Sequence, residues 1–219
     1  LFNLYKMKIA VLSDVHGNLP ALIKALEIIN NINDVNFYIF LGDIVGYGPW
    51  SNECVETISK IKNSAKIIGN HEEYFINRKC KKANVILQNF FKHSFKNFVH
   101  FNEIKQYKTE FVLENIKFKH TINNKYVYKD SKVKLSENTV IGHSHYQYKK
   151  IDNNFFLINP GSVGQNRENI KKLEFAIIDT KNLETLFISQ EYDYKLLINE
   201  MRLKKYPDIC INYYLNKLK

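Results

Sequence analysis

The chain has 219 residues, of which 45% are hydrophobic and 25% are charged. This balance is typical of a globular protein with a full core, and it excludes a disordered or fibrous chain. Lysine and arginine (32) outnumber aspartate and glutamate (22), which gives a net charge of +10. Only three of these basic residues are arginines and no five-residue block of like charge occurs, so the charge argues weakly for a nucleic-acid partner and is more typical of compositional bias.

The first half of the chain alternates apolar runs with helical patterns. Residues 20–31 have apolar residues at helical spacing after Pro20, and a second helix is expected to begin with Ser51 or Asn52 as its cap. Strands are predicted at residues 8–12, 37–41 and 65–69. This alternation of strand, loop and helix predicts a parallel sheet with helices packed on it.

The second half has a different pattern. Residues 73–105 predict two helices, and a closing helix is expected over 191–206 with Asp193 as its cap. The runs between them are short and alternating, which predicts antiparallel hairpins in a second sheet. These runs are residues 111–120, 139–143, 149–159 and 173–189. No linker or repeat separates the two halves, so we expect both sheets to belong to one domain.

The cysteine pattern and the apolar runs favour a cytoplasmic protein. Cys54, Cys80 and Cys210 are an odd number without a Cys-x-x-Cys pair, which predicts neither a disulfide framework nor a cysteine zinc site. The most apolar stretch, residues 37–41, is too short to cross a bilayer, and the opening residues lack a signal-peptide pattern. We therefore expect no membrane partner, and we take residues 1–6, before Met7, as an N-terminal extension.

Four polar motifs each follow an apolar run. They are Asp14-Val15-His16, Gly42-Asp43, Gly69-Asn70-His71-Glu72 and Gly142-His143-Ser144-His145. Because side chains at the carboxyl ends of neighbouring strands converge on one crevice, we expect the four motifs to meet there. Carboxylate, amide and imidazole groups are ligands that suit manganese, iron, cobalt or zinc. Each motif alone is weak, since a strand is often followed by a polar turn, but the four together predict a metal site.

This set of motifs resembles the calcineurin-like metallophosphoesterases, whose pattern is D-x-H, GD, GNH[DE], a lone histidine and GH-x-H. The stretches GDIVGYGP, NPGSVGQNR and YDYKLLINEMRLKKYP are similar to those of small bacterial and archaeal YfcE-like phosphodiesterases. The resemblance covers nearly the whole chain from Met7. It implies an α/β fold, a four-layer αββα sandwich of two mixed β-sheets flanked by helices, and a single metallophosphoesterase domain over residues 7–219.

The resemblance also implies a ligand set for two divalent metal ions, with Mn²⁺ expected first and Fe, Co, Ni, Zn or Mg as alternatives. Asp43 would bridge the two ions. The other ligands would be Asp14, His16 and His145 for the first ion, and Asn70, His120 and His143 for the second. His120 is followed by Thr121 where the family has glycine, so an ordinary histidine in a hairpin stays an alternative at that position.

The family's chemistry implies hydrolysis of a small phosphomonoester or phosphodiester by a metal-bound hydroxide. His71 would be the general acid that protonates the leaving oxygen. Arg167 would bind the substrate phosphate or serve a structural role, and Tyr47 would line the pocket or pack in the core. Glu72 and Glu73 are expected to cap a helix or form salt bridges, and His93 and His100 to be structural.

Two other functions remain open. A protein-binding scaffold on the same fold is the main alternative, although the presence of both Asn70 and His71 argues against it. A nucleic-acid-binding module would rest on the net charge alone and is not expected. Where protein phosphatases of the superfamily carry an Asp-Arg pair, this chain has Gly46-Tyr47-Gly48, which favours a small-molecule substrate. The pattern predicts no oligomeric state.

Overall fold

The apolar run at the start of the first motif forms a strand, β1 (Lys8–Leu12), whose residues after Lys8 are all buried. Because both faces of such a strand are covered, it needs a neighbouring strand on each edge. On one edge it pairs in parallel with β2 (Val35–Phe40), which in turn pairs in parallel with β3 (Ser64–Lys66). This confirms the parallel sheet predicted for the first half.

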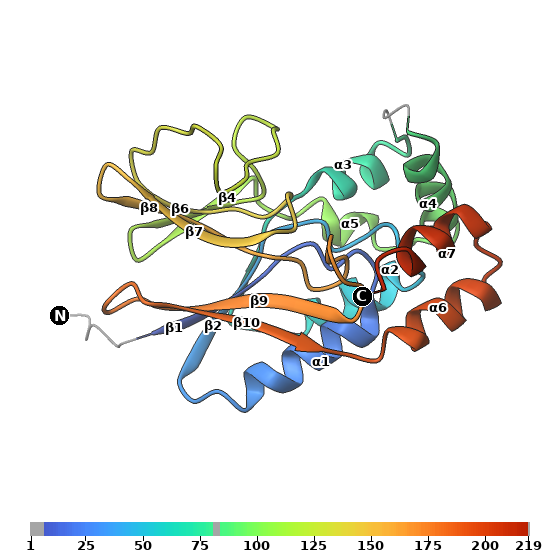
Figure 1. Ribbon diagram of the computed structural model, residues 1–219, viewed down its shortest axis with the longest axis horizontal. Coiled ribbons are helices and arrows are strands. Elements are labelled where there is room, and N and C mark those ends of the chain that lie inside the picture. The colour runs from blue at the N-terminus through green and yellow to red at the C-terminus, as the bar shows by residue number, and fades with distance from the viewer. Residues whose placement is uncertain (1–6, 81–83, 219) are drawn as a thin grey trace.

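The structure is a computed structural model that describes residues 7–80 and 84–218, so the predicted extension, residues 1–6, lies outside it. The described residues form two five-stranded mixed sheets that face each other, with helices on the outside (Figure 1). This is the predicted αββα sandwich. Among the described residues, no helix combines the length and apolar character needed to cross a membrane.

The second sheet has the strand order β4-β5-β6-β8-β7. Its strands are β4 (Glu110–Leu113), β5 (Ile116–Lys119), β6 (Asn138–Val140), β7 (Gln147–Asp152) and β8 (Phe155–Pro160). The outer pairs β4/β5 and β7/β8 are antiparallel hairpins, as predicted, but β6 runs parallel to both β5 and β8. The sheet is therefore mixed, and the loops after β5 and β6 leave it at the same end.

The predicted place of residues 173–189 in the second sheet is wrong. This hairpin forms β9 (Lys172–Asp179) and β10 (Thr185–Glu191), and β9 lies antiparallel beside β1 in the first sheet. The reason is burial: β1 needs a partner on its second edge, and β9 contributes buried side chains to both faces of the first sheet. Alternating hydrophobicity identifies a strand but does not reveal which sheet edge it joins.

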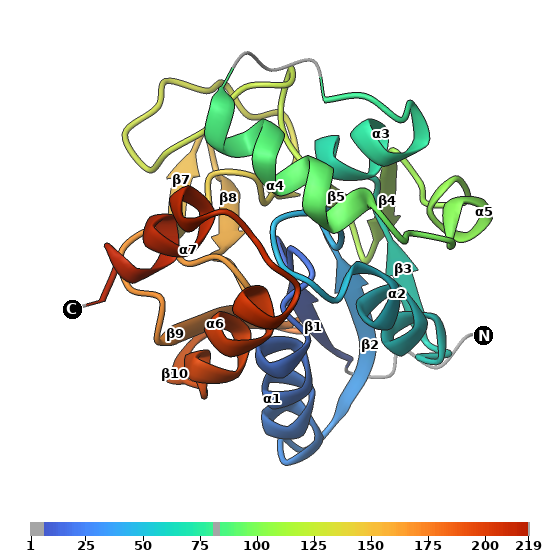
Figure 2. The same cartoon turned by 90° about the vertical axis from the view of Figure 1, so that its right-hand side faces the viewer.

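Helices cover the outer face of the first sheet and one end of the sandwich. They are α1 (Leu19–Asn30), α2 (Ser51–Ser59), α3 (Asn70–Ile76), α4 (Val85–Phe95), α5 (Phe101–Ile104), α6 (Tyr194–Leu203) and α7 (Asp208–Leu215). Figure 2 shows α4 and α7 beside each other at one end of the sandwich. Residues 73–105 thus contribute to three helices where two were predicted, and α7 was not predicted.

Two helix starts test the predicted caps. Asp193 caps α6 as expected, because its carboxylate accepts the Lys195 N–H at 3.1 Å. The predicted cap of α2 is wrong: the helix already begins at Ser51, with Trp50 in the cap position. The Ser51 hydroxyl instead accepts the main-chain N–H of Gly46 at 3.1 Å and so supports the loop after β2.

Apolar side chains fix the strands from both faces. One cluster lies between the two sheets and includes Ile9, Val11, Ile39, Phe118 and Val140. A second cluster packs the other face of the first sheet against α1 and α2. Because the strands are held on both faces, the loops at their carboxyl ends start from fixed positions, which is what a precisely arranged site requires.

Candidate metal centre and pocket

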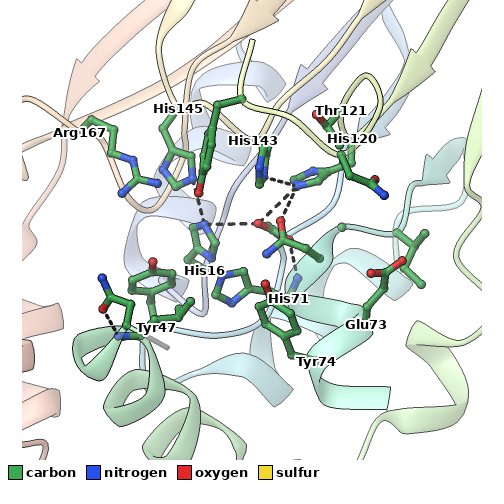
Figure 3. Close-up of a pocket in the computed structure, with 18 of the residues that line it drawn as sticks. His16, Tyr47, His71, Glu73, Tyr74, His120, Thr121, His143, His145 and Arg167 are labelled. Atoms are coloured by element: carbon green, nitrogen blue, oxygen red, sulfur yellow. Dashed lines mark hydrogen bonds and ion pairs between the residues drawn. The ribbon is translucent and has the colours of Figure 1, made fainter. Parts of the chain in front are cut away.

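Ligand-type side chains from both sheets meet at the carboxyl ends of the strands (Figure 3). They are Asp14 and His16 after β1, Asp43 after β2, Asn70 at the start of α3, His120 after β5, and His143 and His145 after β6. All of the residues that the sequence singled out as metal ligands therefore lie in one place.

The first cluster of ligand atoms consists of Asp14, His16 and His145. His145 Nε2 lies 3.2 Å from both Asp14 Oδ1 and His16 Nε2, and His16 Nε2 lies 3.8 Å from the same carboxylate oxygen. All three side chains are almost completely buried. Their ligand atoms thus surround a common point.

The second cluster is centred on His120. Its Nε2 lies 3.1 Å from His143 Nδ1, 3.3 Å from Asn70 Oδ1 and 3.4 Å from Asp43 Oδ2. The same Asp43 oxygen lies 3.9 Å from His16 Nε2 of the first cluster. Asp43 is therefore placed between the two clusters, and His120 lies among ligand-type atoms rather than in an ordinary hairpin environment.

Hydrogen bonds to main-chain carbonyls orient three of the imidazoles. His145 Nδ1 lies 2.7 Å from the Gln165 oxygen, His120 Nδ1 lies 2.7 Å from the Leu41 oxygen, and His16 Nδ1 lies 3.4 Å from the Val45 oxygen. Since a carbonyl oxygen can only accept, each Nδ1 carries a hydrogen and donates it. This is the usual outer support of a metal-binding histidine, and it leaves Nε2 directed at the cluster.

The resulting arrangement fits divalent cations. Nitrogen and oxygen acceptors converge at 3.1–3.9 Å, and Asp14 Oδ1 is buried without a hydrogen-bond partner among the described residues. An unpaired buried carboxylate oxygen is costly unless a cation neutralises it. The mixture of imidazole nitrogens, carboxylates and one amide oxygen suits manganese, iron, cobalt or zinc.

Electrostatics agree with this description. Burial alone would raise the pKa values of Asp14 and Asp43. The surrounding imidazoles outweigh burial and hold both pKa values below the usual range of a carboxyl. Burial lowers the pKa of His143 to about 4, which favours the neutral form that binds metals. Burial also lowers the pKa of His120, yet Asp43 and Asp14 raise it overall, to about 10. The two carboxylates are therefore ionised and favour positive charge at His120 beside them.

Several of the clustered residues have a left-handed backbone. Asp14, His16, Asp43, His143 and His145 have φ between 49° and 67°. Such conformations cost of order 1–3 kcal/mol each and persist where the surroundings hold them, often at functional sites. Here the loops hold one another: the Asp14 N–H donates to the Gly42 oxygen at 3.1 Å, and the His143 N–H donates to Asp14 Oδ2 at 2.9 Å.

Glu72 is a structural member of the site whose importance the sequence did not reveal. Its buried carboxylate accepts main-chain N–H groups of Asp43, Ile44, Val45 and Gly69 at 2.7–3.1 Å. The bond to Gly69 is the predicted helix cap, and the other three hold the loop after β2. Burial and the Asp43 charge raise the pKa of Glu72 to about 7, against the four N–H donors, which favour its ionised form.

His71 lines the cavity beside the clusters. Its main-chain N–H donates to Asp43 Oδ1 at 2.8 Å, and its ring lies 4.7 Å from that of His16 and 5.4 Å from that of Tyr74. Burial lowers the pKa of the imidazole to about 4. His71 also shares a possible ligand group with His16 and Asp43, a placement that the sequence did not suggest.

A cavity of about 570 Å³ opens over the clusters. Its walls include Arg167 and Tyr47, both of which the sequence left with two alternatives. Arg167 Nη1 donates to the Tyr213 hydroxyl at 2.8 Å, so the guanidinium is both held and exposed to the cavity. Tyr47 lines the cavity and also packs against Phe90, with ring centroids 4.6 Å apart.

Residues 160–164 form a turn that supports the first motif. The Ser162 hydroxyl donates to the Asp14 carbonyl at 2.7 Å, and the Val163 and Gly164 N–H groups donate to the carbonyls of Ser13 and Asp14. The donors of this turn therefore hold the Asp14 loop, and the Ser162 hydroxyl has a structural partner.

The two remaining predicted histidines lie outside the cavity lining. His93 Nδ1 lies 2.9 Å from the Asn89 carbonyl within α4, and His100 Nε2 lies 2.9 Å from Glu56 of α2. Glu73, by contrast, lines the cavity and is exposed. Tyr74, Tyr126 and Tyr213 also line it; the sequence did not single them out, because isolated tyrosines in helices and lysine-rich loops have no distinctive pattern.

Fold and site define the protein class. A family model described as a calcineurin-like phosphoesterase superfamily domain matches residues 7–183. The chain therefore belongs to the calcineurin-like phosphoesterase superfamily, which confirms the resemblance read from the motifs.

Similar proteins match nearly the whole length of the chain. The uncharacterized protein MJ0912 of Methanocaldococcus jannaschii is 31% identical, over 93% of this chain and 95% of that protein. A metallophosphoesterase from Sphaerobacter thermophilus has a similar structure, with TM-score 0.81, 22% identity, and coverage of 97% of this chain and 100% of that one. The hypothetical protein PH1004 of Pyrococcus horikoshii has TM-score 0.80, 20% identity, and coverage of 95% and 97%. The two solved structures establish the shared fold.

Proposed function

We propose that the protein is a phosphoesterase that uses two divalent metal ions to hydrolyse a small phosphomonoester or phosphodiester. The observation that carries this proposal is the buried Asp14 Oδ1, which has no hydrogen-bond partner among the described residues and faces the oriented Nε2 atoms of His16 and His145. Membership of the phosphoesterase superfamily supports the reaction type. Manganese is our first choice of metal, ahead of iron, cobalt, nickel, zinc and magnesium.

The proposed ligand assignment follows the two clusters. Asp43 would be shared between the ions. Asp14, His16 and His145 would hold one ion, and Asn70, His120 and His143 the other. When bound, such a pair of ions neutralises phosphate charge and makes hydroxide available at neutral pH. The protein therefore needs no serine or cysteine nucleophile.

His71 is proposed to donate a proton to the leaving oxygen. Its N–H bond to Asp43 fixes the start of α3, so the imidazole is presented to the cavity from a held backbone. Burial favours the neutral imidazole, but a phosphate beside it would favour the imidazolium, because a nearby negative charge raises the pKa of histidine. Substrate binding would thus load the proton that catalysis uses.

Arg167 is proposed to bind the phosphate. One of its guanidinium nitrogens is held by Tyr213, and other donors of the fixed fork remain for phosphate oxygens. No carboxylate pairs with Arg167 among the described residues. A cation without an acidic partner at the wall of a cavity is suited to an anionic ligand.

The test is a metal add-back assay. The protein is stripped of metal, and a chromogenic phosphomonoester and phosphodiester are offered with manganese, magnesium, zinc, nickel, cobalt and iron added singly. We expect turnover with at least one metal and two bound ions per chain by elemental analysis. No turnover with any metal and no bound ions would overturn the proposal and favour a protein-binding scaffold.

Replacing His71 by alanine tests its role. General acid catalysis contributes about 10²–10⁴-fold, so turnover should fall by that factor while the metal content stays at the wild-type value. The loss should be smaller for an ester whose leaving group is a good one, because such a group needs no proton. Loss of metal together with activity would instead identify His71 as a ligand, which its distance to His16 and Asp43 permits.

A further inference from the structure

The cavity is lined by two chemically different sets of side chains. The metal-ligating clusters form one set, and aromatic and aliphatic side chains from three helices and a loop form the other. This second set is called here the aromatic wall, and it consists of Tyr74, Ile86, Leu87, Tyr126 and Tyr213. With a scissile phosphate at the metal-ligating clusters, the organic part of the ester would extend along the aromatic wall.

The cavity is larger than a phosphate group requires. A volume of about 570 Å³ falls within the range of about 300–1,000 Å³ in which proteins hold small organic ligands. A phosphate displaces only a few water molecules, each with a share of about 30 Å³ of liquid volume. Most of the space is therefore available to the organic part of the substrate.

Two tyrosines of the wall lie next to His143 and His71. The Tyr126 ring is stacked on the His143 imidazole with centroids 4.1 Å apart and planes at 16°. The Tyr74 ring lies 5.4 Å from the His71 ring, and Figure 3 shows the two side by side. A phosphate at the clusters would therefore have one tyrosine ring near it on the His71 side and another on the His143 side. Tyr126 is 50% exposed, so part of its ring is available for contact.

The charged and hydrogen-bonding groups of the cavity lining further restrict the chemical class of the ligand. Outside the clusters and His71, the charged residues among the described lining are Arg167 and Glu73, which lie on opposite sides of the cavity in Figure 3. The other polar lining groups are uncharged: Asn84, Thr109, Thr121 and Asn124. Hydroxyl and amide groups beside aromatic rings suit a planar ring with polar edges better than a saturated chain or a second phosphate.

We infer that the site takes a phosphate ester whose organic part carries a planar, polar-edged aromatic ring, such as a nucleoside monophosphate, with the ring against Tyr74 and Tyr126. This inference rests on the proposed function, because it assumes that the phosphate lies at the metal clusters. In this inference the aromatic wall selects the substrate, whereas the metal ligands only bind the ions.

The first test compares two esters with the same leaving alcohol. Adenosine 5′-monophosphate and ribose 5-phosphate both release a primary hydroxyl of ribose, and they differ in the presence of the base. Stacking of a base on an aromatic side chain is worth about 1–3 kcal/mol, so the manganese-loaded protein should prefer the nucleotide by about 5- to 150-fold in kcat/KM. A ratio near one would overturn the inference and leave the proposed phosphoesterase activity intact.

Matched tyrosine variants locate the preference. Tyr74→Leu and Tyr126→Leu should each lower the ratio of nucleotide to ribose 5-phosphate hydrolysis several-fold, with metal content measured to show that His143 still functions. Tyr128→Leu is the control, because Tyr128 is 40% exposed and its ring lies 6.3 Å from that of Tyr126, yet it does not line the cavity. If all three variants keep the wild-type ratio, the aromatic wall does not select the substrate.

Equilibrium binding separates this inference from the proposed function. Calorimetry of manganese-loaded protein with adenosine 5′-monophosphate and ribose 5-phosphate measures the binding of each ester even if the protein hydrolyses neither of them. Tighter binding of the nucleotide by about 5-fold or more, without hydrolysis of either ester, would support the aromatic wall and contradict the proposed activity. Equal binding of both, or binding of neither, would overturn the inference.

Discussion

Glu72 holds two segments of the site together, the loop after β2 at Asp43 and the start of α3 at Gly69. Each of its oxygens accepts two main-chain N–H groups, so its acceptor capacity is fully used. In Glu72→Gln an amide NH₂ replaces one oxygen and would face two N–H donors. Each buried donor left without an acceptor costs about 1–3 kcal/mol, so we expect a loss of about 2–6 kcal/mol in unfolding free energy.

Urea denaturation of the two single variants measures this. Glu73→Gln is the matched control, because Glu73 is the adjacent residue on the same helix but is exposed. An exposed substitution of this kind should change the unfolding free energy by no more than about 0.5 kcal/mol. Equal effects of the two substitutions would mean that the hydrogen bonds of Glu72 contribute little to the fold.

Gly46 is the position where a side chain would reach the proposed general acid. Its φ is +88°, and a Cβ atom there would lie 2.3 Å from His71 Nδ1. Gly46→Ala should therefore displace the His71 ring while leaving the metal content unchanged. A misplacement of about 1 Å can cost about 100-fold in rate, and we expect a fall in kcat of that order in steady-state kinetics.

A double-mutant cycle shows whether Gly46 acts through His71. If it does, adding Gly46→Ala to His71→Ala should reduce the rate little further, because the displaced group is already absent. Full additivity of the two effects would instead indicate that alanine at this position disturbs the loop as a whole.

Some residues of the site could be predicted from the sequence and others could not, for a physical reason. Asp14, Asp43 and His143 could be predicted to meet because each follows a buried run, and the ends of neighbouring strands converge. The hold of Glu72 on the loop after β2 could not be predicted, since its partners are main-chain N–H groups that any residue carries. Tyr126 could not be predicted either, because only the fold places its ring on His143.

At the scale of elements, α2 and α5 are joined by one histidine. His100 precedes α5, and its ring nitrogens lie 2.9 Å from Glu56 Oε1 of α2 and 3.2 Å from Glu103 Oε1. Partial burial lowers the pKa of His100, but the two carboxylates outweigh this and raise it overall. A raised pKa in the folded state means that protonation favours folding, so the contribution is present below about pH 6.5 and disappears as the pH rises through the folded-state pKa.

His100→Ala should therefore destabilise the protein more at about pH 5.5 than at about pH 8.5. Because the carboxylates are about half exposed, the difference should not exceed about 1 kcal/mol in unfolding free energy. In a Glu56→Gln background the pH-dependent part should shrink, since one of the two partners is then uncharged. A loss of the same size at both pH values in the wild-type background would show that the ring acts only by packing.

At the scale of elements, the hydrophobicity pattern of the sequence predicts strands but not which strands pair. The alternation in residues 173–189 identified both β9 and β10, but it could not show that β9 pairs with β1, about 170 residues earlier in the chain. That pairing depends on which buried edge lacks a partner, a property of the folded sheet. The mispredicted hairpin also supports the site, because the Glu174 N–H of β9 donates at 2.9 Å to the carbonyl of Ser162, whose hydroxyl holds the Asp14 loop.

At the scale of the whole molecule, the ligand clusters connect the two sheets. Asp14 and Asp43 follow strands of the first sheet, and His120 and His143 follow strands of the second. Ions bound between them would link both halves of the sandwich and stabilise only the folded chain. At a free metal concentration of 100 times Kd, each site adds about 2.7 kcal/mol, and about 2–4 °C in Tm per kcal/mol is expected for a chain of this size.

Chelation should therefore lower the Tm of the manganese-loaded protein by about 10–20 °C if two sites are filled, measured by scanning calorimetry. His120→Ala removes a ligand of one proposed ion, so about half of the manganese-dependent shift should remain, whereas His93→Ala in α4, outside the cavity lining, should keep all of it. A full shift in His120→Ala would remove this histidine from the ligand set. Because the measurement follows folding rather than turnover, it tests the metal centre independently of which phosphate ester is the substrate.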